Sequence, residues 1–503
     1  MIVLDGKSLT VEAVAAVARQ HAPVSLAAGA RKAVADCAAF LDGLVEEGRP
    51  IYGLTTGFGA LDSRSVSRDA TRGSQHNLLR SHAAGVGSPM AADAVRAMMA
   101  VRANVLASGL TGVREATLDA LLAMLNAGII PRVPEQGSVG ACGDLAPLAH
   151  MALPLIGEGE ARIGAGDWMP GAAALASAGV ERPKVEGRDG LALINGTEQT
   201  TGIGALAVHD AKRLVALAEA VSGLSMEAFG AVSDSFDERT ALAKPHPGQI
   251  ATSAALRRLT AASQAVLPPR PSRLRDSLSI RCIPQVLGAA RDAVALAESV
   301  LEIEMNAAND NPLFGVADGW VTSNSGNFHG QRAGEALDHL ATSVISAAVI
   351  SERRSARFVD EKQNGGLPAF LIHPKARQGE NSGFMIAQYT AASLIAELRM
   401  RAIPATIQSI PTCANTEDHV PMSPLAARRA AFAIDQAMTV VAIEALLAAQ
   451  ALDIRGLAPA PALRPLYASI RARVPRMVDD RVIGPDIAAT RVALESAAPA
   501  VMG

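Results

Sequence analysis

Residues 137–150 read Gly-Ser-Val-Gly-Ala-Cys-Gly-Asp-Leu-Ala-Pro-Leu-Ala-His, and this stretch decides how the rest of the sequence is interpreted. Its Gly-rich first half, taken alone, fits a phosphate-binding loop or a plain turn capped by Asp144. The phosphate-loop interpretation is weak, because no Lys-Ser/Thr pair follows, no strand is expected before it, and the spacing is not Gly-x-Gly-x-x-Gly. Neither simple interpretation accounts for the whole string.

The composition predicts a chain that buries a large core and stays in the cytoplasm. Of 503 residues, 49% are hydrophobic, and the net charge is only −3, so we expect no nucleic-acid or membrane partner. The N-terminus lacks the pattern of a signal peptide, and the apolar runs 339–351 and 437–443 are shorter than the ~20 residues that cross a bilayer. Four scattered cysteines favour a reduced protein without a disulfide framework or a zinc site.

Most of the chain has the apolar periodicity of α-helices. Several of these segments are rich in alanine and poor in charge, which predicts helices buried on most sides, packed in a central bundle or between subunits. Helices are expected at 31–48, 91–109, 114–127, 203–229, 285–306, 331–358, 383–402 and 424–452. Gly-rich segments between them are expected to be loops that carry the chemistry, at 53–60, 137–143, 195–205 and 323–330.

The string at 137–150 resembles the signature of the histidine/phenylalanine ammonia-lyase family, and the resemblance extends over roughly residues 45–460. It implies a mostly α fold of the ammonia-lyase/fumarase-like type, with a long-helix central bundle and an N-terminal lid-and-loop domain. We expect residues 1–200 to form that domain, with the lid at 52–60, and residues 201–503 to form the bundle and the C-terminal helices. The resemblance also implies a homotetramer whose sites are shared between subunits.

In that family an Ala-Ser-Gly tripeptide cyclises to methylideneimidazolone, an electrophile made from the backbone. The corresponding residues are Ala141, Cys142 and Gly143. Ring closure needs an unhindered backbone nitrogen, which Gly143 supplies, and a tight bend. The middle residue must then eliminate its heteroatom, and a cysteine can lose hydrogen sulfide where a serine loses water. The alternative is that Cys142 is a small buried residue and that no ring forms.

Other matching motifs imply a proton acceptor and an imidazole pocket. Tyr52, in Tyr-Gly-Leu-Thr-Thr-Gly-Phe-Gly, matches the lid tyrosine that takes the β-proton of the substrate. A phenol has an ordinary pKa near ~10, so its site must lower the pKa for it to act near neutral pH. His82, in Arg-Ser-His-Ala-Ala-Gly, and Glu417, in Asn-Thr-Glu-Asp-His-Val, match positions that contact an imidazole side chain.

The resemblance also assigns residues to the amino-acid end of the substrate. Asn195, in Leu-Ile-Asn-Gly-Thr, matches the residue that holds this end, and Arg281 matches the arginine that pairs with the carboxylate. Phe328, in Ser-Gly-Asn-Phe-His-Gly, matches an aromatic residue at the reaction centre. Each string alone would be weak, and the matching string at 309–314 is expected to have a structural role.

Two departures from the family pattern both fall on the side of the leaving amine. One is Cys142, and the other is Leu278, where the family has a tyrosine; Arg275 also replaces a glutamine. A quaternary trimethylammonium group has no lone pair with which to attack an electrophile and needs no such activation, since it leaves as a neutral amine. Its apolar methyl groups favour Leu over Tyr. This pattern favours the ergothionase branch, which removes trimethylamine from ergothioneine, the betaine of 2-thiohistidine, and releases thiourocanate.

The matches and departures together leave three functions open. The leading one is elimination of trimethylamine from a small imidazole betaine, with no cofactor and no metal, in which Glu417 and Lys375 polarise the ring and Lys362 is a weaker candidate. The second is a histidine ammonia-lyase that makes urocanate and ammonia with a methylideneimidazolone formed from residues 141–143. The third is an inactive scaffold or assembly protein that keeps the helical fold.

Overall fold

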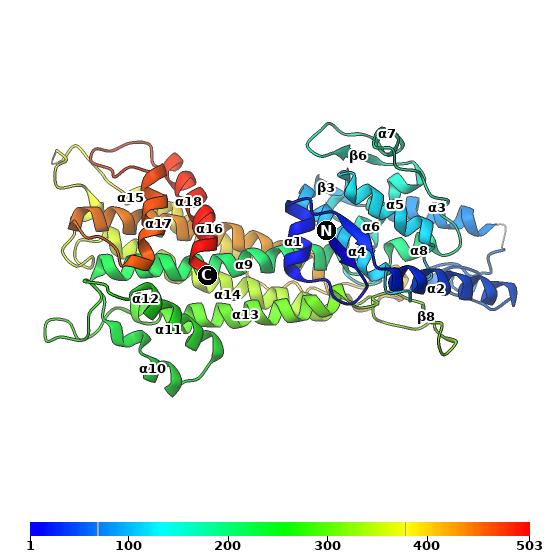
Figure 1. Cartoon of the computed structure of the whole chain (residues 1–503), viewed down its shortest axis with the longest axis horizontal. Helices are drawn as coiled ribbons and strands as arrows, with labels where there is room; N and C mark the ends of the chain where they lie inside the picture. Colours follow the sequence, from blue (N-terminus) through cyan, green and yellow to red (C-terminus); the bar gives the residue numbers. More distant parts are fainter. Residues whose placement is uncertain (68–69, 378, 503) are drawn as a thin grey trace. The chain divides into compact units, whose positions relative to one another are not determined.

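The computed structural model describes residues 1–67, 70–377 and 379–502, and it is mostly α-helical, as the sequence predicted (Figure 1). Every helix expected from the periodicity is present, with ends that differ by a few residues. In the expected order these are α2 (Ala28–Glu46), α4 (Ala92–Leu106), α5 (Glu115–Asn126), α9 (Glu198–Phe229), α13 (Ile283–Met305), α14 (Gln331–Val359), α15 (Met385–Met400) and α16 (Ser423–Arg455).

The chain forms two compact units, each assembled from segments that are far apart in the sequence. The first consists of Met1–His209, Ala297–Asp338 and Pro404–Ala431, and the second of Asp210–Leu296, His339–Ile403 and Phe432–Gly503. The first change of unit lies between His209 and Asp210. Later segments return to the first unit, because helices α9, α13, α14 and α16 each contribute residues to both units.

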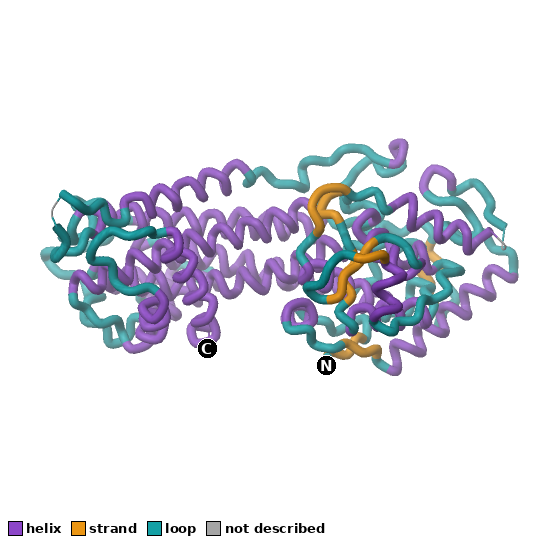
Figure 2. The backbone as a smooth tube through the Cα atoms, turned by 90° about the horizontal axis from the view of Figure 1, so that it is seen from above, coloured by secondary structure: helices purple, strands orange, loops and turns teal. Residues whose placement is uncertain are grey.

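The first unit also contains short helices and all the strands of the described residues, which are orange in Figure 2. Its other helices are α1 (Val11–Arg19), α3 (Thr71–His82), α6 (Leu145–Ala152), α7 (Gly171–Ser177) and α8 (Asp189–Ile194). The strands form small sheets: β1 (Ile2–Leu4) parallel to β2 (Val24–Leu26); β3 (Val86–Pro89) with β5 (Pro134–Gln136); β4 (Ile129–Pro131) with β6 (Glu160–Ile163) and β7 (Met169–Pro170); β8 (Leu313–Gly315) with β9 (Trp320–Thr322).

The core of the first unit is built around α4, in which every residue from Val95 to Leu106 is buried. The start of α9 belongs to the first unit and lies close to α4. A Cβ atom on Gly202 would come within 2.8 Å of the backbone nitrogen of Met98, so only glycine permits this approach. The segment 195–205 was expected to be a loop, but most of it is helical, because α9 begins at Glu198. Close helix packing explains its glycines better than a long turn does.

In the second unit, a buried carboxylate connects three of the long helices. Glu444 of α16 accepts hydrogen bonds of 2.6 Å from Ser225 of α9 and from Ser351 of α14, and it pairs with the fully buried Arg354. Because all these partners satisfy a charge that water cannot reach, they specify how the helices align. The other helices of this unit are α10 (Glu238–Ala243), α11 (Pro247–Leu259), α12 (Leu278–Arg281), α17 (Arg464–Arg473) and α18 (Gly484–Met502).

Helix α16 corrects one expectation about membrane-spanning segments. It has 33 residues and a window of mean hydropathy 1.7, so by length and composition alone it reaches the size of a membrane span. The apolar run 437–443, which is too short to cross a bilayer, is only part of this helix. However, 83% of that window is buried inside the protein, which is the behaviour of a core helix. Burial, rather than length, accounts for its apolar composition.

Candidate active site

The loop that contains Ala141, Cys142 and Gly143 has a strongly bent backbone in the first unit. Cys142 and Gly143 both have left-handed φ angles, 51° and 74°. A Cβ atom on Gly143 would collide with the carbonyl of Gly196, and the neighbouring Asp144 N–H donates to that carbonyl at 2.5 Å. Position 143 therefore requires glycine. The expectation that no strand precedes this loop is wrong, because strand β5 ends at Gln136.

This conformation fits the backbone requirements of ring closure. Two consecutive left-handed residues make the tight bend, and Gly143 has an unhindered nitrogen. A methylideneimidazolone held by Ala141, Cys142 and Gly143 would supply an electrophile for a substrate amine. Compared with the Ala-Ser-Gly tripeptide of the family, the chemistry differs only in the heteroatom that residue 142 must lose: sulfur instead of oxygen.

Asp144 follows the tripeptide and is fully buried. Its carboxylate accepts hydrogen bonds of 2.8 Å from the Thr200 backbone N–H and from the Ser138 hydroxyl. Burial raises the pKa of this carboxyl to about 7, although the two hydrogen bonds act in the opposite direction. The side chain thus fixes the bent loop to the first turn of α9.

Tyr52 lies in the lid, half-buried, and its position is set by the lid itself. Its phenol oxygen accepts a hydrogen bond of 2.9 Å from the backbone N–H of Gly59. Burial is the main cause that raises the pKa of Tyr52 above its ordinary value, while the Gly59 N–H lowers it. Cys142, Cys413 and Glu417 are near enough to raise the pKa further by their charge. The surroundings of Tyr52 in this lid therefore do not by themselves lower its pKa, as a base that acts near neutral pH requires.

Glu417 is held by a short turn that doubles back on itself. Its carboxylate accepts a hydrogen bond of 2.8 Å from the Thr412 hydroxyl, and the backbones of the two residues pair in an antiparallel bridge. The intervening helix η6 (Cys413–Asn415) has left-handed φ angles throughout, between 50° and 67°. The η6 turn contacts the lid helix η1 (Gly59–Leu61), where a Cβ atom on Gly59 would lie 2.8 Å from the Cys413 sulfur.

His82 ends helix α3, and it lies near enough to Glu417 for the charge of that carboxylate to act on its ring. Its Nδ1 lies 2.9 Å from the Leu78 carbonyl, a contact in which Nδ1 carries the proton and donates. Burial lowers the pKa of His82, and the charge of Glu417 raises it. A neutral ring with Nδ1 protonated leaves Nε2 as an acceptor, which suits the N–H of another imidazole.

The Cys142 thiol also interacts with Glu417. Burial is the largest cause that raises the pKa of Cys142 well above its ordinary value, and a side-chain hydrogen bond to Glu417 raises it further. The thiol is thus a neutral donor to the carboxylate. The first unit therefore brings together Tyr52, His82, Cys142 and Glu417, residues that distant motifs in the sequence had pointed to.

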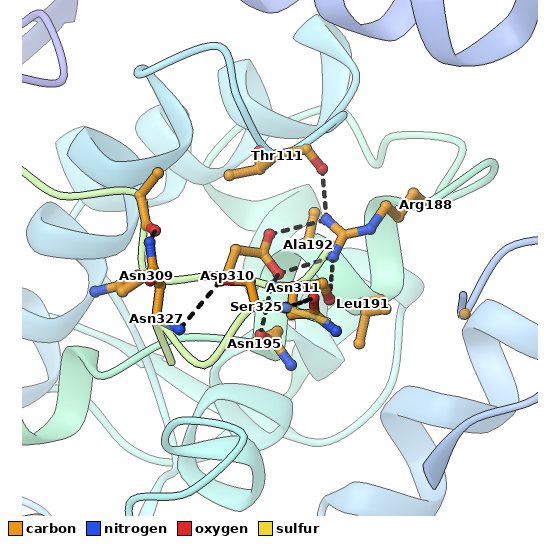
Figure 3. Close-up of polar contacts among 12 residues, drawn as sticks. Thr111, Arg188, Leu191, Ala192, Asn195, Asn309, Asp310, Asn311, Ser325 and Asn327 are labelled. Carbon is orange, nitrogen blue, oxygen red and sulfur yellow. Dashed lines mark hydrogen bonds and ion pairs between the residues drawn. The ribbon is translucent and has the colours of Figure 1, made fainter. Parts of the chain in front are cut away.

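Asn195 is positioned by a buried polar network, drawn in Figure 3. Its side-chain oxygen accepts a hydrogen bond of 3.1 Å from the Asn311 backbone N–H. The adjacent Asp310 forms a bidentate pair with Arg188, with both N–O distances 2.8 Å and both side chains fully buried. Such a fork-shaped pair sets geometry as well as charge. The string at 309–314 therefore supports the site structurally.

Phe328 lies half-buried in the loop 323–330, which the same network holds. The Ser325 N–H donates to the Asn311 side chain at 2.8 Å, and the Gly330 N–H donates to the Gly140 carbonyl at 3.1 Å. The loop of Phe328 is thus tied directly to the loop of Cys142.

The remaining residues selected from the sequence belong to the second unit. Leu278 and Arg281 lie at the two ends of the short helix α12, and both side chains are exposed. Lys375 is exposed in the loop after η5 (Ala369–Leu371), and Lys362 and Arg275 are exposed as well. The residues around Glu417 described above belong to the first unit.

Thr412 and Cys413 shape the Glu417 turn and meet the lid, but the sequence motifs did not point to them. Their left-handed turn contains no glycine, so no residue type signalled it. The anchoring of the bent loop by Asp144 was not expected either, although Asp144 is part of the string 137–150.

Comparisons with known proteins extend over nearly the whole chain. The family model described as aromatic amino acid lyase matches residues 9–472. Histidine ammonia-lyase of Symbiobacterium thermophilum is 47% identical over 96% of this chain and 94% of its own. The structure of histidine ammonia-lyase from Trypanosoma cruzi has a TM-score of 0.91 at 35% identity, covering 99% of this chain and 94% of that one. Ergothionase from Treponema denticola, solved with desmethyl-ergothioneine sulfonic acid, has a TM-score of 0.91 at 29% identity, covering 98% of both chains.

Proposed function

This chain belongs to the aromatic amino acid lyase family and is a carbon–nitrogen lyase, and from this premise we propose that it eliminates trimethylamine from a betaine with an imidazole side chain. The product is the corresponding trans-acrylate. In the most specific form of the proposal the substrate is ergothioneine and the product thiourocanate. Ergothionase, a structural relative at 29% identity, acts within the same fold.

The proposed reaction assigns one role to each group of the first unit. Tyr52 takes the β-proton, the electrons of the C–H bond form the C=C bond, and the C–N bond electrons leave with trimethylamine. The charge of Glu417 acts on His82, and the two residues bind and polarise the ring in this proposal. Asn195 holds the amino-acid end of the substrate. Lys375 is a further candidate for polarising the ring, and Arg281 pairs with the carboxylate.

The two departures from the family pattern, Cys142 and Leu278, support the choice of leaving group. In the proposed reaction Cys142 keeps its sulfur beside Glu417, whereas cyclisation would remove it. A quaternary ammonium leaves as a neutral amine and needs no electrophile. Leu278, which replaces a polar phenol, offers the methyl groups an apolar neighbour and offers a primary ammonium no hydrogen bond.

The second candidate is a histidine ammonia-lyase that releases urocanate and ammonia. Its support is the 47% identity to a relative of that name and the bent conformation of residues 141–143, which suits ring closure. In this case Ala141, Cys142 and Gly143 form the electrophile by losing one water and one hydrogen sulfide.

Intact-protein mass and substrate preference separate the two candidates. The proposal expects the unmodified mass, release of trimethylamine from ergothioneine, and little ammonia from histidine. Cys142→Ala should then retain turnover of the betaine, with a modest loss of stability from the smaller side chain. A mass lowered by the loss of water and hydrogen sulfide, together with ammonia release from histidine that Cys142→Ala abolishes, would establish the second candidate instead.

We also propose that the enzyme is a cytoplasmic homotetramer in which each site uses residues of more than one subunit. The exposed side chains of Arg281 and Leu278 support this, because a second chain can reach them. Mixed tetramers of Tyr52→Phe and Arg281→Ala chains test it. If sites are shared between subunits, mixing and refolding the two inactive variants should restore part of the activity. If verified mixed tetramers recover no activity, one chain supplies both residues of a site.

A further inference from the structure

Two histidines from distant parts of the sequence face each other in the first unit. His329 follows Phe328 in the loop 323–330, and His419 lies two residues after Glu417. The Nε2 atom of His329 lies 3.4 Å from Nδ1 of His419 and 3.3 Å from the His419 carbonyl oxygen. The two rings are stacked, with centroids 5.5 Å apart and planes inclined by 23°.

The two loops are held in place by backbone contacts rather than by the histidines alone. The Gly330 N–H donates to the Gly140 carbonyl at 3.1 Å, and the Met422 N–H donates to the Val139 carbonyl at 2.8 Å. Both loops are therefore tied to the same short segment. The histidine pair is consequently organised in advance, which reduces the entropy that a ligand bridging the rings must overcome.

The contacts between the two histidines are long for hydrogen bonds, and their lengths also match the spacing of two ligands on one ion. A good N–H···O or N–H···N contact has its donor and acceptor about 2.9–3.0 Å apart, and both contacts of His329 Nε2 are longer. In a tetrahedral site with zinc–nitrogen bonds of about 2.1 Å, two ligand nitrogens lie about 3.4 Å apart. That edge equals the separation of the two ring nitrogens, and the carbonyl oxygen lies beside them.

We propose that His329 and His419 form a binding site for a divalent transition-metal ion, with zinc as the reference ion. Imidazole nitrogens suit zinc, copper and nickel, whereas calcium and magnesium prefer oxygen ligands. His329 is half-buried and His419 is exposed, so an ion can enter and water can complete its coordination. The His419 carbonyl is the nearest further protein ligand. This site is separate from the lyase reaction proposed above, which uses no metal.

The sequence offered no sign of this site, because the two residues are 90 positions apart and match no metal-binding spacing. Its location gives it a consequence. An ion bound there would fasten the loop of Phe328 to the loop of Glu417 and would stabilise the folded protein in proportion to its occupancy.

Calorimetric titration of chelator-treated, dialysed full-length protein with zinc chloride tests the proposal. We expect one ion per chain and a higher unfolding temperature in the presence of zinc. His329→Ala and His419→Ala should each weaken zinc binding at least about tenfold and remove the thermal shift. His246→Ala, which changes an exposed histidine at the start of α11, is the matched control and should bind as the parent does.

Copper provides a measurement that needs no variant. The electron paramagnetic resonance spectrum of the parent protein with one equivalent of copper should show coupling to two imidazole nitrogens. The proposal is overturned if that coupling is absent, or if both alanine variants keep the parent's zinc affinity. It is equally overturned if Cys413→Ser or His82→Ala removes zinc binding while the variants of His329 and His419 retain it.

Discussion

The phenol oxygen of Tyr52 accepts a 2.9 Å hydrogen bond from the backbone N–H of Gly59, seven residues further along the same lid. This contact both points the phenol and favours its ionised form, against the larger effect of burial on its pKa. The Gly59 backbone in turn lies against Cys413 of the turn that carries Glu417. The lid thus contacts the turn that carries Glu417.

Tyr52→Phe should abolish turnover and leave the fold intact. The variant keeps the aromatic packing but loses the proposed acceptor of the β-proton and one hydrogen bond, worth about 1 kcal/mol of stability. Steady-state assays and thermal unfolding measure the two effects. Tyr389→Phe, at an exposed tyrosine, is the control. Near-parent activity in Tyr52→Phe would place the base elsewhere.

Arg281→Lys should weaken substrate binding by about 1.5–3 kcal/mol while keeping the charge, in the range of hydrogen bonds to charged groups. A lysine ammonium cannot reproduce the two parallel hydrogen bonds that a guanidinium donates to a carboxylate. The substrate affinities of the Tyr52→Phe variant and of the Tyr52→Phe, Arg281→Lys double variant can be compared directly, because neither is expected to turn the substrate over. The exposed Arg239 supplies a control substitution to lysine. Unchanged affinity would mean that another residue holds the carboxylate.

Asp310→Asn should destabilise the protein by about 3–5 kcal/mol. It leaves the fully buried Arg188 without its bidentate partner, and an uncompensated buried charge is costly. Chemical denaturation measures the change, with the exposed Asp62→Asn as control. A loss below about 0.5 kcal/mol, the range of ordinary surface substitutions, would refute a structural role for this pair.

Glu304→Gln should flatten the pH dependence of stability. Burial raises the pKa of Glu304 to about 7 in the folded protein, so the folded state binds this proton more tightly than the unfolded state does. The free energy of unfolding therefore falls as the pH rises from about 4.5 to 7. Across this pH range the free energy of unfolding of the variant should fall by about 1–3 kcal/mol less than that of the parent.

The rest of that fall comes from other buried carboxyls, among them Asp144 and Asp189, whose pKa values burial raises to about 7 and about 6. Denaturant titrations at a series of pH values measure the profiles, and the exposed Glu47→Gln is the control. Parallel profiles for the Glu304 variant and the parent would show that Glu304 does not titrate in this way.

Local patterns in the sequence predicted the helices well, since the apolar period of 3.6 residues reports directly on a buried stripe. Helices α13 and α14 lie within two residues of the expected ends. The same patterns failed where packing decides. Residues 198–205 are helical, with Gly202 packed against α4, and strand β5 forms by pairing with β3 across 45 or more residues of chain.

By itself, the sequence determined the family, the mostly α architecture and most of the residues proposed for the chemistry, because motif strings and helical periods are local properties. Only the tertiary structure decided that Cys142 interacts with Glu417, that the lid meets Cys413, and that His329 faces His419. These partners are separated by many positions, and non-glycine residues in left-handed conformations shape two of the turns that bring them together. Neither the contacts nor the strained dihedrals have a local signature, since both arise when the surrounding packing fixes the backbone.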